Sequence, residues 1–209
     1  MCIRDSVGSE MCIRDRQHPD SSNLALFKIE ILIFENKLDN AEKLLEGLIL
    51  SEPSNEEIYI QKANIYSKKK LHKKAILCLK KILDFNTDNP EVYSLIGVEY
   101  LFLEDFENAK DNFINCLNYD DSDYSAIYNI VYCFEILEQN DKAIDYLNTY
   151  LDSNPYCEVA WHQLGKQYLI FKNYVKAISA FDFAIISDEY FVGAYIEKGR
   201  ALELSLIHI

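Results

Sequence analysis

The chain has 209 residues, of which 49% are hydrophobic, and its 34 acidic and 21 basic residues give a formal net charge of −13. Phosphate backbones and anionic lipid surfaces repel so acidic a chain, which argues against nucleic-acid or membrane-surface binding. Only four prolines and six glycines interrupt it, so we expect helices rather than many short strands. No apolar run approaches the roughly 20 residues that span a bilayer.

The chain begins with a duplicated pentapeptide, Met-Cys-Ile-Arg-Asp, at residues 1–5 and again at residues 11–15. The copies have no helical or strand-like apolar pattern. A tandem thiol motif is the functional alternative, but two cysteines without a nearby histidine make no metal site. We interpret residues 1–21 as a non-native tail and lead-in, since they look like translated sequencing-adapter read-through, and we set them aside.

From residue 22 onward the sequence repeats with a period of 34 residues. Alanine recurs at five positions of this period: Ala41, Ala75, Ala109, Ala143 and Ala177. Four residues after each alanine stands a large apolar side chain: Leu45, Leu79, Phe113, Leu147 and Phe181. Twelve residues before each alanine, and once more beyond them, stands a mostly small side chain: Ile29, Ala63, Gly97, Val131, Gly165 and Gly199. The period predicts repeated structural units that stack through these positions.

Each unit contains two apolar stretches at helical spacing, joined by a short polar turn such as Glu104-Asp105 or Lys172-Asn173. Asn89-Pro90 predicts a helix start with an N-cap and a first-turn proline, and we expect the same of Asn154-Pro155. One helix pair cannot bury both of its faces, whereas stacked pairs can. The fold class we predict is therefore all-α, an α-solenoid of antiparallel helix pairs.

The predicted solenoid covers residues 22–204. Its repeats are expected at about 22–55, 56–89, 90–123, 124–157 and 158–191, followed by the first helix of a sixth repeat at 192–204. Residues 205–209 are expected to be a second non-native tail, because they break off the sixth repeat where its turn and second helix should follow.

One repeat reproduces in full the pattern W-x2-L-G-x2-Y…A-x3-F-x2-A. It does so through Trp161, Leu164, Gly165, Tyr168, Ala177, Phe181 and Ala184. The chain thus resembles the tetratricopeptide repeat family over about residues 22–204. The resemblance implies a right-handed superhelix whose concave surface is lined by the first helix of each repeat. Lysine replaces the leucine of the family pattern at Lys28, Lys62 and Lys198, and Tyr150 replaces an alanine, so we expect looser packing at these sites.

The resemblance also implies a partner-binding groove on the first helices. Its candidate residues are Ile60, Asn64, Val98, Tyr128, Tyr132, His162, Lys166 and Arg200. Family members that clamp a C-terminal carboxylate place lysine, asparagine and arginine here, and this set is broken by Ile60, Ser94, Val98 and Tyr128. We therefore expect an extended segment or a helix as the ligand, held by aromatic anchors. The alternative for the tyrosines is a position partly in the core.

His162 is expected to be solvated or to contact the partner rather than to act as a catalytic base, because its helix offers no nearby carboxylate. A second candidate surface is basic. Residues 61–83 contain eight lysines and no acidic residue, and five of the lysines form a possible anion-docking patch: Lys68, Lys69, Lys70, Lys73 and Lys74. The alternative is a solvated face that pairs with the acidic flank of a neighbouring repeat.

Neither a catalytic motif nor a metal-ligand set is visible, and the six cysteines show no ligand spacing. We expect buried, reduced cysteines, acidic turns such as 120–123 that cap helices rather than bind calcium, and no cofactor. The chain is expected to be a non-catalytic cytoplasmic scaffold that binds a protein or peptide, not nucleic acid. The alternatives are a regulatory or positioning module of a larger enzyme or secretion or assembly protein, and self-association through the unfinished sixth repeat.

Overall fold

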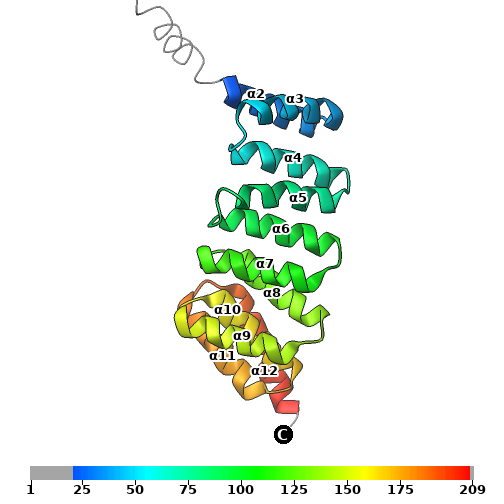
Figure 1. The fold of residues 1–209 in the computed structure, drawn as a ribbon. Coiled ribbons are helices and arrows are strands. Elements are labelled where there is room, and N and C mark those ends of the chain that lie inside the picture. Colours follow the sequence, from blue (N-terminus) through cyan, green and yellow to red (C-terminus); the bar gives the residue numbers. More distant parts are fainter. Residues whose placement is uncertain (1–20, 208–209) are drawn as a thin grey trace, which may run out of the picture. The chain divides into compact units, whose positions relative to one another are not determined.

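The computed structural model describes residues 21–207, and Figure 1 shows that they form helices joined by short turns, without a strand. The duplicated pentapeptide, with its two cysteines, lies outside the described residues. The chain divides into two compact units, which we call unit 1 (described from residue 21 to Thr87) and unit 2 (Asp88 to residue 207). Each unit is described by itself.

Unit 1 contains α2 (Ser21–Phe34), α3 (Leu38–Ser51), α4 (Glu56–Lys68) and α5 (His72–Leu83). Unit 2 contains α6 (Pro90–Phe102), α7 (Phe106–Tyr119), α8 (Tyr124–Ile136), α9 (Asn140–Ser153), α10 (Glu158–Ile170), α11 (Tyr174–Ser187) and α12 (Val192–Ile207). Each even-numbered helix is the first helix of a repeat, and those before α12 pack against the odd-numbered helix that follows them. The predicted all-α solenoid of helix pairs is confirmed.

The recurring alanines lie at the centre of the packing. Every one of the five is completely buried on the second helix of its repeat, as predicted. In two repeats the helices approach so closely that a glycine on the first helix faces a phenylalanine on the second. A Cβ atom on Gly97 would stand 2.8 Å from the Phe113 ring, and one on Gly165 would stand 2.5 Å from the Phe181 ring. The recurring small residues of the first helices therefore contact the recurring large residues of the second helices.

The turn within each repeat has the same backbone geometry in all five described cases. One non-glycine residue adopts a left-handed conformation with φ between 56° and 60°, again at intervals of 34: Asn36, Lys70, Glu104, Glu138 and Lys172. In the turn after α6, the amide of Glu104 donates to the Leu101 carbonyl and that of Asp105 to the Tyr100 carbonyl. This pair of hydrogen bonds is the Schellman motif, which satisfies the last carbonyls of a helix while reversing the chain.

Helix starts agree with the prediction in one place and not in another. Asn89 caps α6 by accepting a hydrogen bond from the Val92 amide, with Pro90 in the first turn, as expected. The same expectation for Asn154-Pro155 is wrong, because α10 begins only at Glu158 and Asn154 ends α9. Pro155 lies in the turn, where its carbonyl accepts a hydrogen bond from the Trp161 indole at 2.8 Å.

The sites expected to pack loosely differ from one another. Tyr150 is half-buried, stacks near Tyr146, and donates its hydroxyl to the Asp121 carbonyl at 2.6 Å, and it also lines a hollow of about 350 Å³. Lys198 pairs with Asp182 at 2.6 Å. The lysine substitution on α12 is thus compensated by a carboxylate on the preceding helix.

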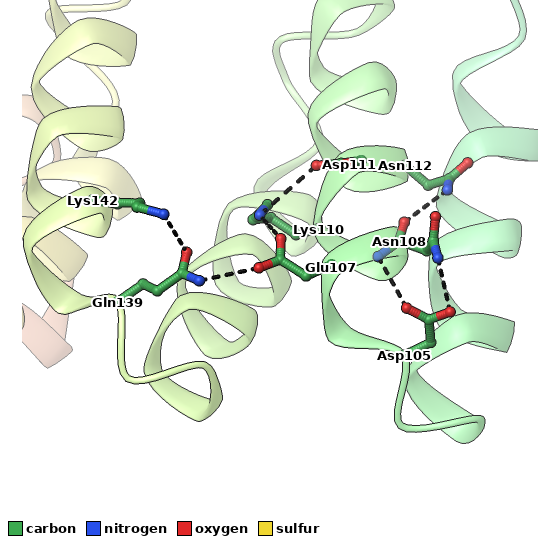
Figure 2. A network of polar contacts seen from close by, with 8 residues as sticks. All are labelled: Asp105, Glu107, Asn108, Lys110, Asp111, Asn112, Gln139 and Lys142. Carbon is green, nitrogen blue, oxygen red and sulfur yellow. Dashed lines mark hydrogen bonds and ion pairs between the residues drawn. The ribbon is translucent and has the colours of Figure 1, made fainter.

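A polar network connects neighbouring repeats of unit 2 at the starts of their second helices (Figure 2). Gln139 donates its amide to Glu107 at 3.0 Å and accepts from the Lys142 ammonium at 3.2 Å. Lys110 pairs with Glu107 and lies over the Phe134 ring at 5.3 Å. The hydrogen bond from Lys110, assisted by that from Gln139, holds the pKa of Glu107 below its usual value. This network positions α7 against the turn between α8 and α9.

Candidate partner-binding groove

Three first helices of unit 2, α8, α10 and α12, share one face of the solenoid. Helix α10 contacts both α8 and α12, which are first helices of the adjacent repeats, whereas the main contacts of α7, α9 and α11 are with first helices. A surface on which first helices meet is the inner, concave side of such a stack. Between α10 and α12 it is hollowed by about 240 Å³, and this hollow is lined by Lys166, Leu169, Ile170, Glu197, Arg200 and Leu204.

The two tyrosines of α8 are the aromatic centre of this face. Tyr128 is 41% exposed and Tyr132 is 46% exposed, so each presents about half of its surface to a ligand. The Phe106 ring packs edge to face against the Tyr132 ring, with a centroid distance of 6.2 Å. Burial raises the pKa of the Tyr128 phenol. Each tyrosine is thus fixed in the structure while remaining accessible, as an anchor requires. On α6, Val98 is half-buried.

The sequence analysis missed a third row of groove side chains, one helical turn beyond the predicted positions. Large apolar residues recur there every 34 residues: Phe102, Ile136, Ile170 and Leu204. The first three are 62%, 47% and 51% exposed, although each is large and apolar. Ile170 and Leu204 line the same hollow as Lys166 and Arg200, which places these two on the groove face, and the period indicates the same face for Phe102 and Ile136. The 34-residue period of these four residues was the signal that could have identified them.

His162 differs from the expectation. It is not solvated but buried, with its ring edge-on to Phe191 at 5.1 Å and tilted against Phe181 at 5.8 Å. Burial, reinforced by the charge of Lys166, lowers the pKa of the imidazole, so the ring is neutral at pH 7. His162 therefore forms part of the groove floor rather than its exposed surface.

Two glutamines on α10 were not predicted at all. Gln163 and Gln167 are buried, and Gln167 donates its amide to Glu135 of α8 at 2.6 Å. Within the described part of the chain, the Gln167 carbonyl oxygen has no hydrogen-bond partner, nor does either ring nitrogen of His162, whereas the Gln163 amide hydrogen-bonds to the Tyr128 phenol. Unpaired polar atoms of this kind are unfavourable by about 1–3 kcal/mol each. Buried glutamine carries no periodic sequence signal, which is why these positions escaped prediction.

The cations of the groove are concentrated at α10 and α12. Arg200 is exposed and approaches Glu197 to 3.6 Å, while Lys166 is half-buried and makes no ion pair with any residue in the described range. In unit 1, Ile60 and Asn64 of α4 are both half-buried at the equivalent positions.

The lysine patch of unit 1 is partly neutralised within the unit itself. Lys69 pairs with Asp39 at 2.7 Å and with Glu42 at 2.6 Å, and the Lys74 ammonium lies over the Tyr66 ring at 5.6 Å. Lys68, Lys70 and Lys73 remain exposed. Lys74 is exposed as well, so four of the five lysines keep their charge without a carboxylate partner in the described range, and the pairing with an acidic neighbour that we considered does occur at Lys69.

The remaining cysteines and acidic residues have structural surroundings, and the Cys116 thiol donates to the Asp123 carboxylate at 3.3 Å. Cys116, Cys133 and Cys157 are buried free thiols and Cys78 is half-buried. The acidic turn caps α8, since Asp123 accepts from the amides of Ser125 and Ala126. Within residues 21–207, no cluster of histidine, cysteine and carboxylate side chains is placed to hold a metal ion, and no helix is long and apolar enough to cross a bilayer.

Comparison with known families identifies the repeat. Two family models described as tetratricopeptide repeat match the chain, one at residues 32–97 and the other at residues 90–123 and 124–157. Together they cover more than half of the chain, and the two matches at 90–123 and 124–157 coincide with the helix pairs α6–α7 and α8–α9. The chain belongs to the tetratricopeptide repeat family, whose members are typically non-catalytic scaffolds for protein interactions.

Two curated relatives have repeats similar to these. Anaphase-promoting complex subunit 3 of Schizosaccharomyces pombe is 26% identical over 73% of this chain and 23% of its own length. Superkiller complex protein 3 of Homo sapiens is 31% identical over 52% of this chain and 7% of its own length. The chain thus spans less than a quarter of either relative.

Solved structures share the fold at lower identity. A crystal structure of MamA matches with a TM-score of 0.60 and 19% identity, over 82% of this chain and 93% of MamA. YrrB, a tetratricopeptide repeat protein with an unusual peptide-binding site, matches with a TM-score of 0.56 and 19% identity, over 90% of this chain and 97% of YrrB. At such identity these matches concern the fold alone.

Proposed function

We propose that the concave face of unit 2 binds an extended segment or an amphipathic helix of a protein partner, without performing chemistry of its own. The observation that carries this proposal is the accessible row of apolar and aromatic side chains on successive first helices, at Phe102, Tyr132, Ile136 and Ile170. Large exposed apolar patches on a folded protein mark interaction sites. Aromatic side chains that are already held in place lose little entropy on binding and serve as anchors.

The polar groups of the groove support the same proposal. Lys166 and Arg200 flank the apolar hollow between α10 and α12, so an acidic residue of the partner beside an apolar one is favoured there. The unpaired carbonyl oxygen of Gln167 is suited to accept a hydrogen bond from a partner's backbone amide after a side-chain rotation. Apolar anchors supply affinity and the polar groups fix the register.

A pull-down tests this assignment. Bait carrying both Tyr128→Ala and Tyr132→Ala should lose the partners that the wild-type chain retains, because the aromatic anchors are removed. A matched control carries Tyr156→Ala and Tyr190→Ala, two tyrosines that are each 81% exposed and lie in turns between repeats. The control should retain the partners. Equal retention by both double variants would assign binding to another surface.

A second candidate is a positioning or regulatory module within a larger protein. Its support is that the curated relatives are much longer than this chain and are named as members of multi-protein complexes. In that case the groove would hold a segment of an assembly partner or of the same polypeptide. Sequencing the gene in both directions tests it, and an open reading frame without any further domain would remove this candidate.

A further inference from the structure

Unit 1 contains a second hollow, in a different place from the groove. It measures about 230 Å³ and lies between α3, α4 and α5, lined by Ile49, Tyr59, Lys62, Leu77, Cys78 and Lys81. Four of these side chains are apolar or aromatic and two are lysines. An apolar cavity with a cation at its edge is the arrangement that holds an apolar group next to a negative charge.

The hollow exists because of one substitution in the repeat. Lys62 stands at the position that Ile96, Ile130 and Leu164 occupy in the next three repeats, and all three of those side chains are buried in the core. A lysine side chain cannot occupy this core position as an aliphatic side chain does, because its ammonium group must remain near water. The space that a branched aliphatic side chain fills elsewhere is therefore open here.

The positive charge at the hollow is not neutralised from within the unit. Neither Lys62 nor Lys81 makes an ion pair with a residue of the described range. The carboxylate of Glu42 lies near Lys62, but Lys69 binds it at 2.6 Å and Tyr66 also hydrogen-bonds to it. By contrast, Lys198 occupies the same repeat position on α12 and is paired with Asp182. Lys28 shares this repeat position and, like Lys62, makes no ion pair within residues 21–207, and of the two Lys62 lines the hollow.

The hollow faces away from the groove. Lys62 is two residues from both Ile60 and Asn64, which corresponds to a rotation of about 200° around α4. A ligand in the hollow therefore leaves the groove positions of the same helix free. This geometry makes the hollow a separate interaction surface rather than an extension of the groove.

Its size selects the class of ligand. Pockets that enclose a drug-sized molecule typically have volumes of about 300–1,000 Å³, and this hollow is smaller. It suits one large apolar side chain rather than a whole cofactor or a long acyl chain. The two unpaired lysines, Lys62 and Lys81, favour a ligand that carries carboxylates beside this apolar side chain.

We propose that this hollow is a docking site for an acidic peptide segment that inserts one large apolar side chain, with flanking carboxylates on Lys62 and Lys81. Such a site contributes little affinity alone, because the inserted surface is small and the ion pairs are partly solvated. Combined with the groove of unit 2 on the same partner, it strengthens binding through effective concentration.

Amide chemical-shift mapping on the full chain tests the proposal. The probe is N-acetyl-Glu-Phe-Glu-amide, with N-acetyl-Lys-Phe-Lys-amide and sodium decanoate as comparisons. The acidic peptide should shift the amides of Leu77 and Cys78 and saturate in the millimolar range, whereas the basic peptide should not. Shifts produced by decanoate alone would assign the hollow to a fatty acid and overturn the proposal, as would equal shifts from both peptides.

Two variants and a control complete the test. Lys62→Leu restores the aliphatic residue of the other repeats and fills the hollow, so peptide binding should fall at least about tenfold while the melting temperature of unit 1 rises. Lys81→Gln should weaken binding several-fold without changing the melting temperature. Lys73→Gln removes an exposed lysine of the same segment that does not line the hollow, and should change neither. Unchanged binding in both Lys62→Leu and Lys81→Gln would refute the proposal.

Discussion

At the scale of single residues, the contact between first and second helices is governed by size complementarity. The two repeats with glycine on the first helix have phenylalanine on the second, whereas the repeats with Ile29, Ala63 or Val131 have leucine. Where the side chain on the first helix is smaller, the side chain on the second helix is larger, so the contact stays densely packed. Each of these large side chains on the second helix is buried.

This complementarity predicts the effect of adding one methyl group. Gly165→Ala should lower the free energy of unfolding by about 1–3 kcal/mol, because its Cβ collides with the buried Phe181 ring, which cannot move away. Gly199 has the same position in the repeat, but a Cβ atom there would meet no neighbouring heavy atom within 4 Å. Gly199→Ala should therefore be neutral or stabilising by up to about 1 kcal/mol, because alanine favours helix. Urea unfolding followed by circular dichroism measures both, and equal effects would contradict the packing described.

Residue-level prediction from sequence succeeded where a side chain follows the period and failed where it depends on neighbours. The five alanines could be placed in the core because their recurrence reports a repeated contact. His162 could not, since its burial depends on Phe191, which lies in the turn before α12. Likewise, the departure at Lys62 was visible in the sequence, but whether a carboxylate compensates it could be seen only in the structure.

At the scale of elements, the turns explain how helix pairs form without glycine. A left-handed residue with a Cβ atom is unfavourable by roughly 1–2 kcal/mol, yet Glu104, Glu138 and Lys172 adopt this conformation. The two Schellman hydrogen bonds and the packing of both helices hold the chain in place. The polar dipeptides identified the turns from sequence, but not their handedness.

Strain in these turns can be removed by substitution. Lys172→Gly should raise the free energy of unfolding by up to about 1 kcal/mol, because glycine adopts positive φ without steric conflict. Lys172→Ala keeps the Cβ atom and should bring no gain, which makes it the matched control. Chemical denaturation of the wild type, Lys172→Gly and Lys172→Ala measures these differences in the free energy of unfolding. A gain from alanine equal to that from glycine would show that the lysine side chain, not the backbone, is responsible.

Helix boundaries illustrate a limit of local sequence rules. Asn-Pro begins α6 but ends α9, although the dipeptide is the same. Pro90 lies 15 residues after Ala75, whereas Pro155 lies 12 residues after Ala143, so the two dipeptides occupy different positions in the repeat. The position of the dipeptide within the 34-residue period, rather than the dipeptide itself, determines whether it begins or ends a helix.

At the scale of the whole molecule, the recurring alanines and the exposed apolar side chains of the groove lie on different helices of a repeat. The second helices carry the recurring alanines and the polar network of Figure 2, while the first helices of unit 2 present the exposed apolar rows. We propose two surfaces for partners, the groove of unit 2 and the hollow of unit 1. The period of the sequence predicted the fold, whereas the hollow required the packed structure. The groove positions remain a prediction from the family resemblance.

The most direct measurement is hydrogen exchange of the wild-type chain with and without a purified partner obtained from the pull-down. Binding in the groove should slow amide exchange in α6, α8, α10 and α12, because a bound segment restrains the opening of the helices it touches. The second helices α7, α9 and α11 should change less. Protection confined to those second helices would contradict the assignment of the concave face as the binding surface.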